Sequence, residues 1–308
     1  MSHPSRFPLC VVLCALTLFA QSPAIPGVVA AGTQPQLVQE GFKFTAGPVG
    51  SFDGGLYFTD VAADKIYYLD PSGKIRDIRN STAGANGLAF NGSELYAAEG
   101  KGKLISRGNS NGRAVAILES DARTPLSAPK DLIFDARGGA FFTDPGNTPL
   151  LPKTPGRAGK VYYMSTSAGQ PPFAFDDKMA FPNGIALSVD YRALYVDDTL
   201  GGTVWAFDIL LNGAVKNKHA FAKSPLLTDG ESLAEGMCVD RDSRLYVASG
   251  AGVQVFDKKG KSLGNIMVPR QPTNCAFSGP DKKTLYITAR EGLYSLKTLT
   301  AGPLRTGK

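Results

Sequence analysis

The sequence predicts an all-β protein, a six-bladed β-propeller of four-stranded blades. Short runs of Val, Ile, Tyr, Phe and Leu alternate with turns rich in Gly, Asp, Asn and Pro, which is typical of strands and hairpins. No stretch of ten or more residues keeps a helical period. One local pattern occurs six times: a loop, an apolar strand, a turn and a second strand that ends in polar residues.

One residue at the start of each of the six units marks the period of the repeat. We call these residues the openers; they are Ala46, Asn86, Lys130, Asn183, Glu235 and Asn274. Successive openers are 40, 44, 53, 52 and 39 residues apart. A period of about 40 to 50 residues that holds four strands is typical of propeller blades.

The strands of each unit follow its opener in a fixed order. In the first unit, the opening strand turns at residues 53–55, and further strands follow at 56–60, 65–69 and 74–78. The later units repeat this order, with second strands at residues 95–99, 140–144, 193–198, 245–249 and 285–290. The sixth unit is short, so we expect residues 36–44 to supply its outer strand and close the ring.

The two ends of the chain lie outside the repeat. Residues 1–31 have the pattern of a signal peptide: a basic n-region, an apolar h-region and a cleavage region of small residues. We expect cleavage between about residues 20 and 31. The apolar run is too short to span a bilayer comfortably, so we expect export to the periplasm or the exterior, with no membrane span after cleavage. The propeller domain then covers residues 36–296, and residues 297–308 form a C-terminal tail.

Charge and cysteine content narrow the possible partners. The net charge is +6, but the basic residues are scattered, which argues against nucleic-acid binding and leaves a small molecule as the expected partner. Signal cleavage leaves Cys238 and Cys275 on neighbouring inner strands, either as two small buried hydrophobic residues or as one disulfide. We find no sequence signal for an oligomeric state.

The openers predict where the site lies. The first strand of each propeller blade lies nearest the central channel, so the openers are expected to form a ring at one mouth. The second strands run antiparallel to the first and bring further polar residues back to the same face. Convergent polar groups of this kind are the default location of a ligand site. The candidate substrate-binding residues are Asn86, Lys130, Asp131, Asn274, Asp60, Glu99, Asp144, Asp198 (or its neighbour Asp197) and Arg290.

Each opener also has a plainer interpretation as a polar turn residue, because Asn-Gly is a common turn pair. Six openers in register favour a shared ring. Residues 145–159, an insertion rich in Pro and Gly in the third unit, are expected to form a loop over one face that influences substrate choice.

Several motifs resemble the gluconolactonase and senescence-marker-protein family, also called regucalcin-like. They are residues 45–49 (TAGPV), 129–132 (PKDL), 182–185 (PNGI), 234–237 (AEGM) and 279–286 (GPDKKTLY), and the resemblance covers about residues 36–296. It implies a six-bladed propeller, a divalent metal, often calcium, in the channel, and hydrolysis of lactones or, in relatives, organophosphates.

The family's metal-site residues are only partly kept in this chain. The family's metal-binding Glu before Gly-Pro is Ala46 here, and its Asn before Asp is Lys130. Asn183 keeps the family's Asn before Gly, and Glu235 replaces its Asp, which is both ligand and candidate base. Asn183 and Glu235 are therefore the implied metal ligands, for Ca²⁺ or another divalent cation, and Lys130 in the same ring opposes that metal.

Three functions remain open. The first is an exported lactonase that still uses a metal held by Asn183 and Glu235. The second is a metal-independent hydrolase or lyase/synthase, with Lys130 as electrophile or nucleophile and Glu235 as acid/base. Related propellers that resemble strictosidine synthase work without a metal and use a Glu. The third is a non-catalytic propeller that binds a small molecule.

Overall fold

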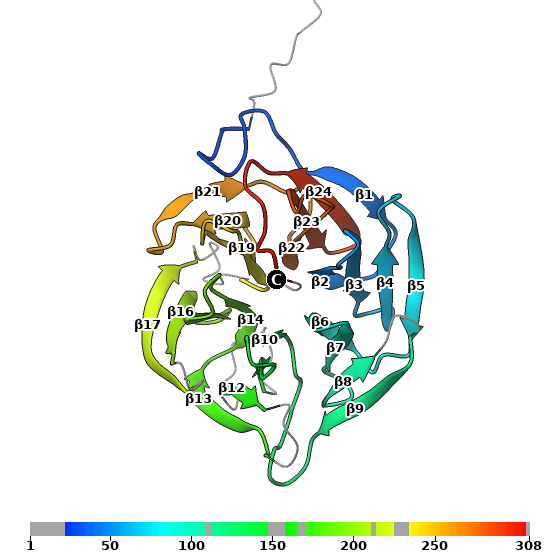
Figure 1. The fold of residues 1–308 in the computed structure, drawn as a ribbon, viewed down its shortest axis with the longest axis vertical. Helices are drawn as coiled ribbons and strands as arrows, with labels where there is room; N and C mark the ends of the chain where they lie inside the picture. Colours follow the sequence, from blue (N-terminus) through cyan, green and yellow to red (C-terminus); the bar gives the residue numbers. More distant parts are fainter. Residues whose placement is uncertain are drawn as a thin grey trace, which may run out of the picture.

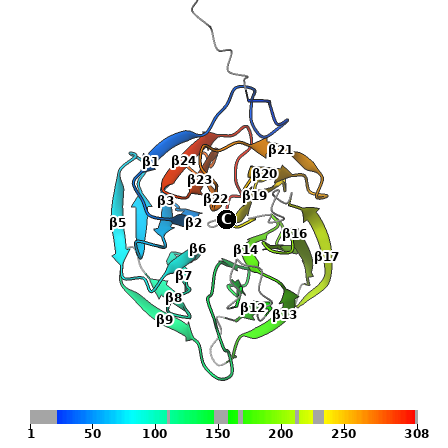
Figure 2. The ribbon, with the colours of Figure 1, turned by 180° about the vertical axis from the view of Figure 1, so that it is seen from behind.

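The computed structural model describes residues 22–108, 112–146, 158–165, 170–210, 214–224 and 234–305. Within these ranges the chain forms six four-stranded antiparallel sheets and no helix. The sheets are arranged like blades around a central axis (Figure 1), and the view from behind shows the same ring (Figure 2). The predicted six-bladed propeller is therefore confirmed.

The first three blades follow the sequence order. Blade 1 contains β2 (Thr45–Gly50), β3 (Leu56–Asp60), β4 (Lys65–Leu69) and β5 (Ile75–Asn80). Blade 2 contains β6 (Ala85–Asn91), β7 (Glu94–Glu99), β8 (Leu104–Gly108) and β9 (Ala114–Glu119). Blade 3 contains β10 (Leu132–Phe134), β11 (Ala140–Asp144), β12 (Gly159–Met164) and β13 (Phe173–Met179). In each blade the first strand is innermost (Figure 1).

The other blades complete the circle, and the last one takes a strand from the N-terminal side. Blade 4 contains β14 (Pro182–Leu187), β15 (Ala193–Asp198), β16 (Thr203–Ile209) and β17 (Val215–Lys223). Blade 5 contains β18 (Met237–Val239), β19 (Leu245–Ser249), β20 (Gly252–Phe256) and β21 (Ser262–Ile266). Blade 6 contains β22 (Asn274–Ser278), β23 (Thr284–Ala289), β24 (Gly292–Lys297) and β1 (Gln36–Glu40), which pairs antiparallel with β24 as the sequence predicts.

The core lies between the blades. Six clusters of buried apolar side chains are present, and each draws its residues from two neighbouring blades. Between blades 1 and 2, for example, Val49 and Tyr57 pack with Leu88 and Phe90. A blade with a neighbour on each side is covered on both faces, which explains why the second strand β3 is buried at every position.

Threonine hydroxyls join neighbouring blades close to the channel. Thr59 donates to the main-chain oxygen of Asn86 at 2.9 Å, and Thr143 donates to that of Asn183 at 2.6 Å. Thr273 does the same across the ring closure, to the main-chain oxygen of Thr45 at 2.6 Å. These hydrogen bonds run from one blade to the opener strand of the next and fix the spacing of the inner ring.

The segments that flank the repeat also pack on the propeller. Ile25, Val28 and Val29 are buried in the cluster between blades 5 and 6, although the sequence places them at the exit of a signal peptide. The main-chain oxygen of Val28 accepts a hydrogen bond from the N–H of Leu299 at 2.8 Å. In the part of the chain that the structure describes, no helix is long and apolar enough to cross a membrane. Residues 1–21 and most of the predicted loop at 145–159 lie outside the described ranges.

Candidate active site at one mouth of the channel

The openers lie where the inner strands begin, at one end of the channel. Asn86 and Asn274 lie within β6 and β22, while Lys130 and Glu235 come two residues before β10 and β18. The openers' main chains also connect the blades: the N–H of Gly87 donates to the main-chain oxygen of Lys130 at 2.9 Å. The inner strands contact one another around the axis, so the openers share one mouth as the sequence predicts.

The glycine after an opener allows the next blade to approach closely. A Cβ on Gly184 would lie 1.9 Å from the main-chain oxygen of Glu235, and a Cβ on Gly236 would lie 1.8 Å from Cγ of Asn274. Side chains at these positions would force the blades apart. The glycines of the Asn183-Gly184 and Glu235-Gly236 pairs therefore do more than permit a turn, because each one packs directly against the next blade.

Glu235 has the environment of a general base. Its side chain is buried, and among the described residues it forms no hydrogen bond or ion pair. Burial raises the pKa of the Glu235 carboxyl, and the positive charges of Lys130 and Arg290 oppose that rise. Glu235 thus lies within electrostatic reach of two cations: Lys130, which is an opener, and Arg290, which directly follows β23 of blade 6.

Asn183 is held by a hydrogen-bond chain on blade 4. Its amide nitrogen donates to Oγ1 of Thr199 at 3.1 Å, and Thr199 also lies 2.5 Å from the main-chain oxygen of Ala234 and 3.3 Å from Oδ1 of Asp197. The other oxygen of Asp197 accepts the N–H of Gly184 at 2.9 Å. This arrangement fixes the orientation of Asn183 at the channel mouth.

Asp197 is a residue whose place at the site the sequence did not settle. It is fully buried, and burial raises its pKa well above the ordinary value, with further contributions from the charges of Asp198 and Glu235. Alignment of the repeats could have identified Asp197 as the unusual residue, because it occupies the position at which blades 1 and 3 have Thr59 and Thr143. The charge of Glu235 acts on Asp197, whereas both carboxylate oxygens of Asp198 accept main-chain N–H groups.

Three of the predicted substrate-binding acids have a structural role instead. Asp60, Asp144 and Asp198 each accept the main-chain N–H groups of the residues three and two positions before the opener of their own blade, at 2.7–3.1 Å. Glu99 forms an ion pair with Arg79 at 2.6 Å and a hydrogen bond with Ser106 of its own blade. These contacts do not favour substrate binding by the four acids, because their oxygens already satisfy protein donors.

The remaining predicted residues occupy different positions. Asp131 is buried, and its carboxylate accepts the N–H of Leu132 at 3.0 Å and of Ile185 at 3.4 Å, so it links blades 3 and 4. Oδ1 of Asn274 accepts the N–H of Cys275 at 2.8 Å. Asn86 and Lys130 are half-buried at the mouth, and the guanidinium of Arg290 stacks 5.2 Å from the ring centre of Phe44.

The donor set does not fit the predicted calcium ion. Of the four positions that would hold the metal, Ala46 has no side-chain oxygen and Lys130 carries a positive charge. Only Asn183 and Glu235 offer side-chain oxygens, and the positive charges of Lys130 and Arg290 already stabilise the Glu235 carboxylate. Ca²⁺ takes six to eight oxygen ligands. The described residues also hold no group of three or more His, Cys, Asp or Glu side chains that could bind a metal.

Comparisons with known proteins agree with this architecture. The chain is 25% identical to a gluconolactonase from Zymomonas mobilis, over 91% of this chain and 86% of that one, and 26% identical to regucalcin from Xenopus laevis, over 82% and 85%. A solved gluconolactonase from Xanthomonas campestris superposes with a TM-score of 0.77 at 28% identity, over 87% of this chain and 90% of that one.

A calcium-binding regucalcin from Agrobacterium tumefaciens superposes with a TM-score of 0.75 at 19% identity, over 88% of this chain and 97% of that one, and shows the same fold. The family described as "SMP-30/Gluconolactonase/LRE-like region" matches residues 44–291, which is most of the chain. The chain therefore belongs to the SMP-30/gluconolactonase/LRE-like family.

Proposed function

We propose that the protein is a lactone hydrolase that opens its substrate at the channel mouth formed by the openers. Similarity to a gluconolactonase from Zymomonas mobilis and a pentonolactonase from Haloferax volcanii supports this reaction class. The observation that carries the proposal is the environment of Glu235: a buried carboxyl without a hydrogen-bond partner among the described residues, acted on by Lys130 and Arg290. That arrangement suits a general base beside a cationic oxyanion site.

The proposed mechanism uses these side chains alone. The Glu235 carboxylate accepts a proton from water as the water oxygen bonds to the lactone carbonyl carbon. The carbonyl electrons move onto oxygen, and the Lys130 ammonium stabilises the resulting oxyanion. When the carbonyl re-forms, the ring C–O bond breaks and the leaving oxygen takes the proton from Glu235. The product is a hydroxy acid, and its carboxyl proton passes to solvent.

The decisive experiment measures lactone hydrolysis with and without a chelator. We expect turnover that persists in EDTA and falls by about a hundredfold or more in Glu235→Gln, since general bases contribute 10²–10⁴-fold. Lys130→Met should lose a comparable factor, whereas Lys130→Arg should retain part of the rate. Loss of activity in EDTA would instead support a metal bound at Asn183 and Glu235.

Two further outcomes correspond to the other functions. Trapping of a substrate adduct on Lys130 by borohydride would indicate a Schiff-base lyase or synthase. No turnover on a panel of lactones and esters, with ligand binding that depends on Lys130, would indicate a binding protein. Three of the four family positions differ in this chain, and two of them, Ala46 and Lys130, have lost the metal-binding side chain, which favours this alternative over a metal-dependent enzyme.

We also propose that the protein acts after export, in the periplasm or outside the cell. The support is the pattern of residues 1–31, with a basic residue, an apolar run and small residues in order. Fractionation of cells that express the full chain tests this: the protein should appear outside the cytoplasm, and a chain without residues 1–21 should remain inside.

A further inference from the structure

A cavity of about 620 Å³ opens at the channel mouth opposite the openers. Its walls include the turns that follow the inner strands: Val189 and Tyr191 after β14, Arg241 after β18, and Lys282 after β22. The openers lie at the other ends of these same strands. The cavity is therefore separate from the candidate active site.

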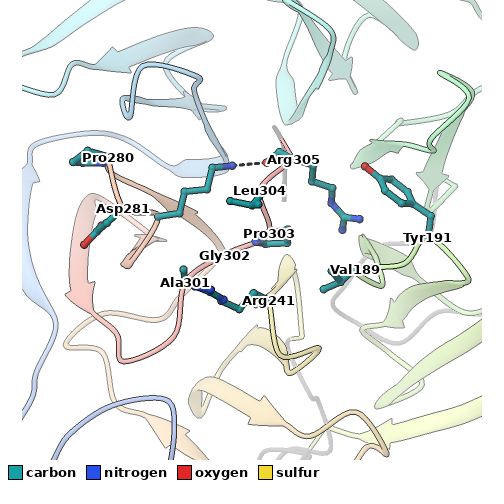
Figure 3. Close-up of a pocket in the computed structure, with 11 residues that line it drawn as sticks. Val189, Tyr191, Arg241, Pro280, Asp281, Ala301, Gly302, Pro303, Leu304 and Arg305 are labelled. Carbon is teal, nitrogen blue, oxygen red and sulfur yellow. Dashed lines mark hydrogen bonds between the residues drawn. The ribbon is translucent and has the colours of Figure 1, made fainter.

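The C-terminal segment forms the remaining wall. Residues 301–305 turn in from blade 6 toward the centre of the ring (Figure 1), and the N–H of Gly302 donates to the main-chain oxygen of Lys282 at 2.9 Å. The Arg305 guanidinium donates to the main-chain oxygens of Leu187 at 2.6 Å and Ser188 at 2.8 Å. It also lies 4.6 Å from the ring centre of Tyr191, and Figure 3 shows the two side chains next to each other. These contacts hold the C-terminal segment in place as one wall of the cavity.

Positive charge predominates in the lining. The lining includes three cations, Arg241, Lys282 and Arg305, and one carboxylate, Asp281, which is exposed and accepts the N–H of Lys283 at 2.9 Å. Within the described ranges, neither Lys282 nor Arg241 forms an ion pair. Lys282 is half-buried, and burial together with the charge of Arg305 lowers its pKa. An anion in the cavity would relieve this repulsion.

The other lining groups are mainly apolar. Val189, Pro280, Ala301 and Pro303 contribute carbon surface, and Leu304 projects at the rim with 99% of its surface exposed. Figure 3 shows Leu304 and Pro303 on the same segment as Arg305, between the two sides of the cavity. A ligand that satisfies both kinds of wall combines a negative head with an aliphatic body.

We propose that this cavity binds an organic anion, a carboxylate carried on an aliphatic chain, at a site separate from the active site. The carboxylate would lie by Lys282 and Arg241, and the chain would lie against Val189, Pro303 and Leu304. Pockets of about 300–1,000 Å³ hold small organic ligands, and the volume of this one falls in that range. The proposal does not depend on lactone hydrolysis at the other mouth.

Calorimetric titration with sodium octanoate tests the proposal, using the folded chain. We expect one octanoate per chain, with 1-octanol and octylamine binding at least about tenfold more weakly because they lack the negative head. Lys282→Met should weaken octanoate binding by about tenfold. Lys283→Met, on the same turn but outside the lining, is the matched control and should leave the affinity unchanged.

Two more variants keep the test decisive. Lys282 also donates a hydrogen bond to the main-chain oxygen of Arg305, so the Lys282→Met substitution also removes a contact that holds the C-terminal segment. Leu304→Asp leaves that contact in place. It adds a negative charge at a fully exposed position on the rim and should also weaken octanoate binding. Glu235→Gln should bind octanoate normally. Equal binding of octanol, unchanged affinity in both Lys282→Met and Leu304→Asp, or loss of binding in Glu235→Gln would each overturn the proposal.

Discussion

At the scale of single residues, the charge of Arg290 is expected to set the pH range in which Glu235 works as a base. Burial raises the pKa of Glu235 above the ordinary value of 4.5, and Lys130 and Arg290 oppose the rise. Activity should therefore fall as the pH drops through this raised pKa. In Arg290→Met one opposing charge is lost, so the acid limb of the kcat/KM profile should move to higher pH, whereas Arg290→Lys should keep it near its original position. A limb that moves to lower pH would contradict this electrostatic account.

Asp197 makes a residue-scale prediction about stability. Burial raises its pKa, so between the ordinary and the raised pKa the folded chain keeps a proton that the unfolded chain releases. The free energy of unfolding should then decrease as pH rises, by up to about 1.4 kcal/mol per pH unit for this group. Asp197→Asn cannot ionise and should be increasingly more stable than the wild type as pH rises. Urea unfolding at several pH values checks this; parallel curves for the two proteins would refute it.

At the scale of elements, Gly236 is expected to control how closely blades 5 and 6 pack. A Cβ at this position would lie 1.8 Å from Cγ of Asn274, so Gly236→Ala should cost about 1–3 kcal/mol of unfolding free energy and displace Asn274 from the mouth. Gly100→Ala is the matched control, because the nearest atom to its Cβ would be 3.4 Å away. Thermal melting of both variants gives the comparison, and equal melting temperatures would show that blade 6 moves without cost.

The N-terminal segment provides a second prediction for an element. Ile25, Val28 and Val29 are at most 4% exposed, and burying each such side chain contributes about 1.5–3 kcal/mol. A chain that starts at Gly32 should therefore melt at a lower temperature than one that starts at Ser22. For the same reason we expect signal cleavage before Ile25, which the intact mass of the exported protein will show. An exported chain that begins after Val29 would contradict the prediction.

For the molecule as a whole, the sequence predicts what depends on local repeats and does not predict what depends on contacts between distant segments. The six blades and the β1–β24 closure could be predicted, because hairpins and their turns recur at a regular period. The different roles of Asp197 and Asp198 could not, because only the folded structure shows that Asp197 is affected by Glu235 and that Asp198 accepts main-chain N–H groups. The burial of Val28 and the cavity beside Arg305 also depend on segments that fold back from the two ends.

The cysteine pair tests the packing of the whole ring, because it spans two blades that meet only through tertiary contacts. Sγ of Cys238 on β18 lies 3.4 Å from Sγ of Cys275 on β22, both side chains are buried, and no disulfide joins them. A disulfide needs about 2.05 Å between the sulfurs, so the two act as small packed side chains. A chain without residues 1–21 should show no thiol reactive to DTNB when native and two after unfolding without reductant. No thiol after unfolding would mean that a bridge joins blades 5 and 6, and the melting temperature should then fall on reduction.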